Sequence, residues 1–276
     1  MAETPYGEST KVALYGAVGT RKTLQIGHLI ETFGAENVGI VSCEHGLGTI
    51  KSLINPDGVY GINEENAKES PLVGFRNGWA WAEKAYNRPD AWVCVDGGSR
   101  VIQWLQDEIV GGTDRCMEAM MGGLSKTNLP ADLRKFARFV TKDLDINGQA
   151  QWIALANATQ QMLNAWMRLR CSMYWTFWEE QTSLDQYRKG LPWRPDCPGK
   201  GSLDAILGSF DFIFRLHYEG KVPEGGVNAG CDVASKVYRA KVRDDWRGGT
   251  PVPKEIQDFN LAEFVKQYLT AKGDKA

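Results

Sequence analysis

One short segment near the N-terminus carries residues in an order that suits phosphate binding, Gly16-Ala17-Val18-Gly19-Thr20-Arg21-Lys22-Thr23. Backbone N–H groups of a glycine-rich loop, together with those at the start of a following helix, can surround phosphate oxygens. The lysine neutralises the charge of the outer phosphates, and the threonine hydroxyl can bind Mg²⁺. The order therefore predicts that residues 16–23 bind the phosphates of a nucleotide, with Thr23 as a metal ligand.

Arg21 departs from the pattern that such loops follow. The pattern G-x-x-x-x-G-K-[ST] has glycine immediately before its lysine, whereas this chain has Arg21 there. Glycine adopts a positive φ without steric cost, but a side chain at such a position costs about 1 kcal/mol or more. The arginine either adds positive charge for the phosphates or blocks the pocket. Phosphate binding is therefore predicted, and hydrolysis is left open.

An aspartate follows another apolar run of the chain. Asp96 comes directly after Trp92 to Val95, a segment that is typical of a buried strand. A carboxylate in this place can order the Mg²⁺ shell across from the loop threonine. Thr23 and Asp96 are therefore the predicted metal ligands, and capping of a turn is the alternative role of Asp96.

Short apolar runs alternate with segments of helical periodicity along most of the chain. Strands are predicted at 11–15, 38–43, 91–95, 173–178 and 210–218, with an antiparallel partner of the last at 236–243. Helices are predicted at 22–33, 47–54, 75–86, 101–109, 131–143, 150–169 and 261–269, and irregular segments at 57–72, 111–128 and 182–202. This alternation indicates an α/β fold with a mostly parallel central sheet flanked by helices and a C-terminal antiparallel hairpin.

No linker divides the chain, so one domain is predicted over residues 1–276. Its core covers about residues 10–250, with a helical insertion at about 109–170 and a C-terminal helix at about 260–271.

The composition narrows the classes of function. The net charge of −2 excludes a global basic field for nucleic acid, so any such binding must be local. No run of 18 apolar residues occurs, which argues against a membrane span. The six cysteines form no C-x-x-C pair, so a zinc site is not expected, and reduced thiols suit a cytoplasmic protein.

Taken together, these motifs resemble the RecA-like P-loop ATPases. The segments 11–23, 41–48 and 92–96 carry most of the resemblance, which covers roughly residues 10 to 250. Within that superfamily the chain is most similar to short phage-encoded ATPases that assist single-strand annealing and recombination. The segment 198–202, which leads into 210–216, is also similar to that group. The resemblance implies a RecA-like fold, ATP and Mg²⁺ as cofactors, and the host cytoplasm as the location if the chain is phage-encoded.

The resemblance also implies catalytic roles for particular residues. Glu44 would activate the attacking water, with a solvated carboxylate beside the loop residue His45 as the alternative, and Lys22 would act on the phosphates. Gln181 or Glu179, after the fourth strand, would sense the terminal phosphate, although a simple exposed strand end fits them equally. Arg243, near the end of the last strand, would complete the site of a neighbouring subunit, and pairing with the aspartates that follow it is the alternative.

Two kinds of partner follow from the same resemblance. One is further copies of this chain, in a ring or a filament. The other is single-stranded DNA, because the loop at 182–202 combines basic and aromatic side chains that suit backbone charge and base stacking. The candidates in this loop are Arg188, Lys189, Trp193, Arg194 and Lys200, with aspartates among them that dilute the charge.

Two other functions remain open. Arg21 is also compatible with a nucleotide-binding scaffold that shows little or no hydrolysis. An ATPase in another phage DNA process, such as packaging or replication, fits the same motifs.

Overall fold

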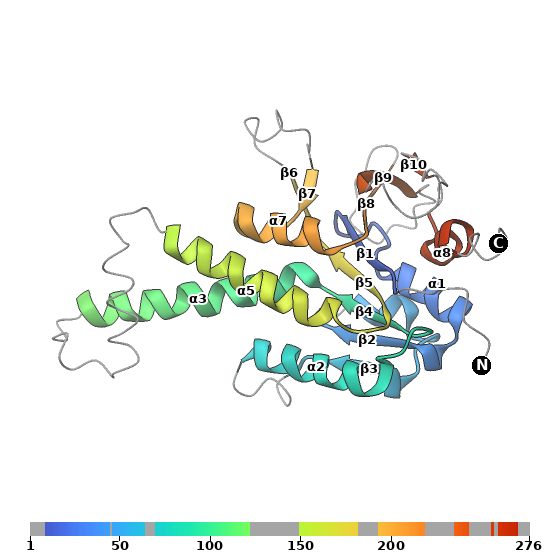
Figure 1. The fold of residues 1–276 in the computed structure, drawn as a ribbon, viewed down its shortest axis with the longest axis horizontal. Helices are drawn as coiled ribbons and strands as arrows, with labels where there is room; N and C mark the ends of the chain where they lie inside the picture. Colours follow the sequence, from blue (N-terminus) through green and yellow to red (C-terminus); the bar gives the residue numbers. More distant parts are fainter. Residues whose placement is uncertain are drawn as a thin grey trace.

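The computed structural model describes residues 9–44, 46–63, 70–121, 149–181, 193–218, 235–242, 255–256 and 259–269. At its centre lies an eight-stranded sheet with the strand order β10-β9-β8-β1-β5-β4-β2-β3 (Figure 1). The strands from β8 to β3 in this order are parallel, and β9 and β10 extend the sheet in antiparallel pairing. A second, two-stranded antiparallel sheet is formed by β6 and β7. The predicted α/β class, with flanking helices and an antiparallel hairpin, is confirmed.

The element bounds follow the chain in order. The strands are β1 (Lys11–Gly16), β2 (Val38–Ser42), β3 (Val59–Gly61), β4 (Trp92–Asp96), β5 (Ser172–Phe177), β6 (Glu179–Gln181), β7 (Trp193–Pro195), β8 (Phe212–Tyr218), β9 (Ser235–Val242) and β10 (Glu255–Ile256). The α-helices are α1 (Leu24–Phe33), α2 (Pro71–Tyr86), α3 (Gly98–Met121), α5 (Gln149–Met167), α7 (Lys200–Ser209) and α8 (Leu261–Leu269). Short 3₁₀ turns are η1 (Ala35–Asn37), η2 (Gly46–Ile50) and η3 (Pro56–Gly58).

The strand order brings the ends of β1, β5 and β4 to one edge of the sheet. β5 pairs with β1 on one side and with β4 on the other, so it separates the loop at 16–23 from Asp96 by one strand. Relative to β1, strands β2 and β4 lie on one side of the sheet, and β8 lies on the other side. In parallel sheets, ligands bind outside the carboxyl ends of the strands where the chain changes direction in this way.

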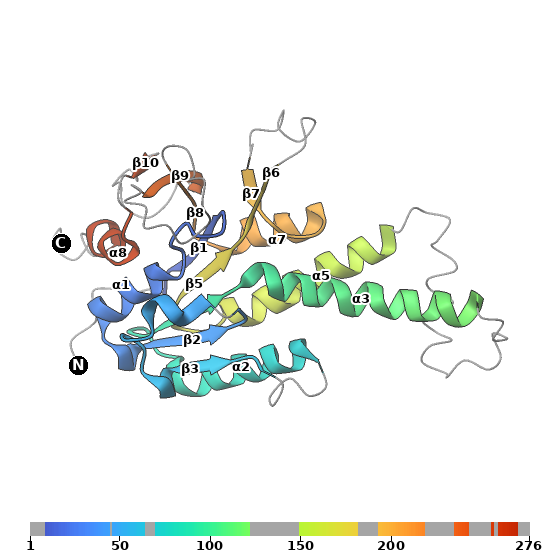
Figure 2. The same cartoon turned by 180° about the vertical axis from the view of Figure 1, so that it is seen from behind.

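Apolar side chains cover both faces of the sheet. Along β1, Ala13 and Tyr15 belong to the apolar cluster that also contains residues of α2, α3, α5 and α7, whereas Val12 and Leu14 belong to the cluster that contains residues of α1 and α8. This alternation is the period of two that a strand buried on both faces requires. Figures 1 and 2 show α1 and α8 on one side of the sheet, and α3 and α5 running side by side beyond its edge. Among the helices that the structure describes, none combines the length and apolar character that a membrane span requires.

Two of the segments that were predicted to be irregular contain regular structure. Residues 111–121 continue α3, although an irregular segment was expected from Gly111-Gly112. Each glycine costs only about 1 kcal/mol in a helix interior, and an established helix extends more easily than a new one forms. Within 57–72, residues 59–61 form β3, and α2 begins at Pro71 rather than at Phe75.

The start of α2 has a clear local cause. The Ser70 side chain accepts a hydrogen bond from the N–H of Val73 at 3.3 Å, and proline occupies the first helical position. Both features favour a helix N-terminus. The Ser-Pro pair is the sequence signal that locates this end.

The predicted loop at 182–202 is wrong over its second part. Trp193–Pro195 pairs with β6 as β7, and α7 begins at Lys200. Pro198 and Gly199 favoured a loop, but Gly199 takes a positive φ of 78° directly before the helix. Residues 182–192 and the predicted helix at 131–143 lie outside the described residues.

The C-terminal segment is attached to α1 through one buried amide. The Gln25 side chain donates to the carbonyl oxygen of Phe259 at 3.1 Å and accepts from the N–H of Leu261 at 2.8 Å. Phe264 packs edge-to-face on Phe212, from the central sheet. Helix α1, which follows the loop at 16–23, therefore has α8 as its partner on this face.

We expect Gln25→Leu to lower the free energy of unfolding by about 2 kcal/mol or more, because it leaves a buried N–H and a buried carbonyl without partners. Urea unfolding followed by circular dichroism measures this loss. The exposed Gln161→Leu on α5 is the matched control and should change stability by less than about 0.5 kcal/mol. Equal stabilities of the two variants would contradict the assigned role of Gln25.

Candidate functional site

The loop at 16–23 turns tightly at its first residue. A Cβ atom on Gly16 would lie 2.3 Å from the carbonyl oxygen of Leu216 in β8, so only glycine fits there. Ala17, Val18 and Gly19 are exposed at the tip, and Gly19 has a φ of 82°. The loop thus lies exposed between β1 and α1, where its backbone N–H groups are accessible to an anion, and the Val18 side chain is exposed at its tip.

Lys22 folds back over this loop. Its Nζ donates to the carbonyl oxygens of Gly16 at 2.7 Å and Ala17 at 2.8 Å. From β5, the buried Tyr174 hydroxyl donates to the Lys22 carbonyl at 2.8 Å and fixes the start of α1. Burial lowers the pKa of Lys22 to about 8, while nearby carboxylates, Glu44 first among them, act to raise it. The ammonium group therefore lies at the loop and at the N-terminus of α1, where an anion is favoured.

Asp96, the last residue of β4, connects the loop to β4 and β5. Its side chain is only 3% exposed and accepts hydrogen bonds from Thr23 Oγ1, at 3.2 and 3.3 Å to its two oxygens. Burial raises the pKa of Asp96, and hydrogen bonds from Thr176 and Thr23 act against that increase. Gly46 adds no side chain here, and a Cβ on it would lie 3.2 Å from Asp96 Oδ2. The two predicted metal ligands are thus side by side.

Thr176 belongs to this cluster, although the sequence analysis did not single it out. Its hydroxyl donates to Asp96 Oδ1 and accepts from the N–H of Gly97, both at 2.9 Å. The available signal was a polar residue between Trp175 and Phe177 at the end of an apolar run. A polar residue was expected after this strand rather than within it, so Thr176 was not among the predicted site residues.

Glu44 lies against the turn that follows Asp96. A Cβ on Gly97, whose φ is 107°, would lie 2.7 Å from Glu44 Cγ. Burial raises the pKa of the Glu44 carboxyl, as does the negative charge of Asp96, while a hydrogen bond from the Trp178 side chain lowers it. Glu44 Oε1 is buried, and within the described residues it has no hydrogen-bond partner. This oxygen can accept a proton from a bound molecule.

The residues after β5 pair with their own surroundings. Glu179 accepts a hydrogen bond from Arg215 Nε at 2.9 Å, and both side chains are mostly buried. The backbone of Gln181 lies in β6, while its side chain and the whole of Arg243 are outside the described residues. The sensor and neighbouring-subunit roles of Gln181 and Arg243 therefore stay predictions.

Three DNA-contact candidates are described, and each contacts another part of the chain. Arg194 forms an ion pair with Glu180, and Lys200 forms one with Asp204 at 3.0 Å. The Trp193 ring lies 4.3 Å from the Arg215 guanidinium. Arg188 and Lys189 lie outside the described residues.

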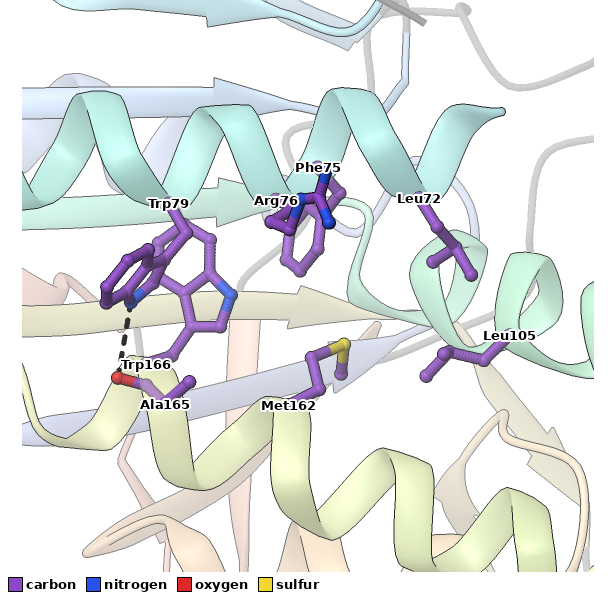
Figure 3. Close-up of a pocket in the computed structure, with 8 residues that line it drawn as sticks. All are labelled: Leu72, Phe75, Arg76, Trp79, Leu105, Met162, Ala165 and Trp166. Carbon is purple, nitrogen blue, oxygen red and sulfur yellow. Dashed lines mark hydrogen bonds between the residues drawn. The ribbon is translucent and has the colours of Figure 1, made fainter. Parts of the chain in front are cut away.

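A separate cavity of about 370 Å³ lies between α2, α3 and α5 (Figure 3). One hydrogen bond crosses it, from Trp79 Nε1 to the Ala165 carbonyl at 3.2 Å. Apolar side chains dominate the lining residues, which are Leu72, Phe75, Arg76, Trp79, Leu105, Met162, Ala165 and Trp166. No predicted site residue lines it, so its chemistry differs from that of the cluster at the ends of the strands.

Within the described ranges, no group of three or more His, Cys, Asp or Glu side chains is placed to hold a metal ion. Thr23 and Asp96 stay the predicted protein ligands to Mg²⁺, which is commonly bound through one or two carboxylates plus phosphates and water. The comparison with models of protein families and with curated proteins gives no match for this chain. The geometry of the cluster is therefore the basis for a function.

Arg21 adopts the backbone conformation that its place in the loop predicts, with a φ of 64°. We expect Arg21→Gly to be more stable than Arg21→Ala by roughly 1 kcal/mol, because alanine keeps the Cβ that is strained at positive φ. Parallel urea unfolding of the two variants measures the difference. An alanine variant as stable as the glycine variant would show that the loop relaxes without strain.

The Thr176 hydroxyl should matter more than its methyl group. We expect Thr176→Val to cost about 2 kcal/mol, since a buried N–H and a carboxylate oxygen lose their partner. Thr176→Ser keeps the hydroxyl and should cost only about 1 kcal/mol for the lost methyl group. Thermal unfolding of both variants tests this order, and a valine variant at least as stable as the serine variant would reverse it.

Proposed function

We propose that this chain binds ATP with Mg²⁺ at the ends of β1, β4 and β5 and hydrolyses it, as RecA-like P-loop ATPases do. The observation that carries the proposal is the contact of Thr23 with Asp96 at 3.2 Å, across the strand that carries Thr176. This contact links the loop that carries Lys22 to the buried carboxylate of Asp96. These are the parts that phosphoryl transfer needs.

Binding would use the loop and the start of α1. The N–H groups of residues 16–23 and the positive end of the helix dipole would surround the phosphates. Lys22 would exchange its bonds to the Gly16 and Ala17 carbonyls for phosphate oxygens, so its charge is already at the required place. Thr23 and Asp96 offer oxygen ligands that suit Mg²⁺, which when bound neutralises phosphate charge.

Hydrolysis would use Glu44 as the general base. Its Oε1 is a buried acceptor without a partner in the described part of the chain, and its raised pKa makes it a better base near neutral pH. The Trp178 side chain would hold the carboxylate in place. A water hydrogen-bonded to Oε1 would lose its proton to Glu44 as its oxygen attacks the terminal phosphorus. The bond from that phosphorus to the bridging oxygen breaks in the same step, and ADP leaves.

The test is phosphate release from ATP and Mg²⁺ by the parent protein and two variants. We expect Lys22→Ala to weaken ATP binding by about tenfold or more, since a charge-assisted bond to phosphate is lost. Glu44→Gln should keep binding and lower turnover by about 100-fold or more. Lys84→Ala and Glu83→Gln, both exposed on α2, are the matched controls and should behave as the parent.

Nucleotide binding that is insensitive to Lys22→Ala would contradict the proposed site. Tight binding without phosphate release would instead support the scaffold function, which the strained Arg21 favours. In that case Arg21→Gly is the variant in which to look for turnover. Single-stranded DNA as an effector, and recombination as the process, rest on the sequence resemblance. Adding DNA to the same assay tests them through stimulated turnover.

A further inference from the structure

The strand beside the phosphate loop places an arginine at the edge of the candidate site. In the β1–β8 ladder, Arg215 lies opposite Tyr15, and Leu216 lies opposite Gly16, the first residue of the loop. The Leu216 carbonyl contacts Gly16 so closely that a Cβ there would approach within 2.3 Å. The backbone of Arg215 is therefore fixed one residue from the start of the loop.

The Arg215 side chain is held by two groups. Its Nε donates to Glu179 Oε2 at 2.9 Å, and its guanidinium lies 4.3 Å from the centre of the Trp193 ring. The side chain is 16% exposed, and that of Glu179 is 10% exposed. Within the described residues, Nε–H is the one donor of this guanidinium that has a hydrogen-bond acceptor. A guanidinium has five N–H donors in a fork that matches phosphate oxygens.

Glu179 connects this pair to the loop lysine. It lies two residues after Phe177, which is opposite Tyr15 in the β1–β5 ladder. Glu179 and Arg215 thus belong to the two strand ends that flank the residue before the loop. The Glu179 carboxylate also acts on the Lys22 ammonium group. Glu179 therefore lies within electrostatic range of both cations, Lys22 and Arg215. A bound polyphosphate would meet the charge of Glu179 at this place, where Arg215 is paired with it.

We propose that Arg215 is a second phosphate-binding cation, and this proposal rests on the ATP site proposed above. Its guanidinium would move from Glu179 to the terminal phosphate of a nucleoside triphosphate. The guanidinium offers bidentate hydrogen bonds, and Nε–H can pass from a carboxylate oxygen to a phosphate oxygen. A diphosphate lacks the outermost group and leaves the Arg215–Glu179 pair closed. Arg215 thereby contributes to the discrimination between ATP and ADP.

The test compares a single and a charge-balanced double variant. Isothermal titration calorimetry measures the dissociation constants of ADP and of the non-hydrolysable imido analogue of ATP, each with Mg²⁺. We expect Arg215→Gln to weaken the triphosphate analogue by about tenfold or more and ADP by less than about threefold. The double variant Glu179→Gln/Arg215→Gln restores the net charge of the parent, and it should stay as selectively weakened as Arg215→Gln.

Recovery of the parent's affinity in the double variant would overturn the proposal, because Arg215 would then serve only to neutralise Glu179. An equal loss of affinity for both nucleotides would also overturn the proposal, because it would show that the Arg215–Glu179 ion pair has only a structural role. If Arg215→Gln does not fold, the double variant, in which two amides can hydrogen-bond, carries the comparison with the parent.

Lys22→Ala separates this proposal from the proposed function. If Lys22→Ala abolishes binding while the Arg215 variants show no selectivity, only the role of Arg215 fails. If the parent binds neither nucleotide, both fail.

Discussion

The buried carboxylate of Asp96 is the group on which the rest of the site depends. A charged group that is 3% exposed is stable only with hydrogen-bond donors around it, and these come from Thr23 in the loop at 16–23 and Thr176 in β5. The same Thr176 hydroxyl also accepts from the N–H of Gly97, so it fixes the turn after β4. One carboxylate thereby sets the spacing of three chain segments that are distant in sequence.

The helix that follows the loop is supported on its other side by a different device. The Gln25 amide joins α1 to the segment that enters α8, and the phenylalanines of β8 and α8 fill the space between them. The loop is thus fixed between a polar network at the strand ends and an apolar layer beneath α1. The loop can expose its backbone groups because β1 before it and α1 after it are held by buried contacts.

The sequence was informative where the local signal was strong. Four- to six-residue apolar runs located the central strands, and glycine spacing with Lys22 and Thr23 located the loop between β1 and α1. It failed where tertiary contacts decide the outcome. Trp193–Pro195 is a strand because β6 is there to pair with it, and the segment has no apolar period of its own. The role of Thr176 could not be predicted, because nothing in a single sequence shows that the ends of β4 and β5 are neighbours. The pairing of Arg215 with Glu179, across 36 residues, was beyond any local pattern.

The turn at Gly97 has a mechanical consequence. It joins Asp96 directly to α3, a continuous helix of 24 residues that extends beyond the sheet beside α5 (Figures 1 and 2). At 1.5 Å per residue such a helix is about 36 Å long. If the turn were to rotate by about 5°, the far end of a rigid rod of that length would travel about 3 Å. A small rotation at the turn would thus become, at the distal end of α3, a displacement the size of an atom.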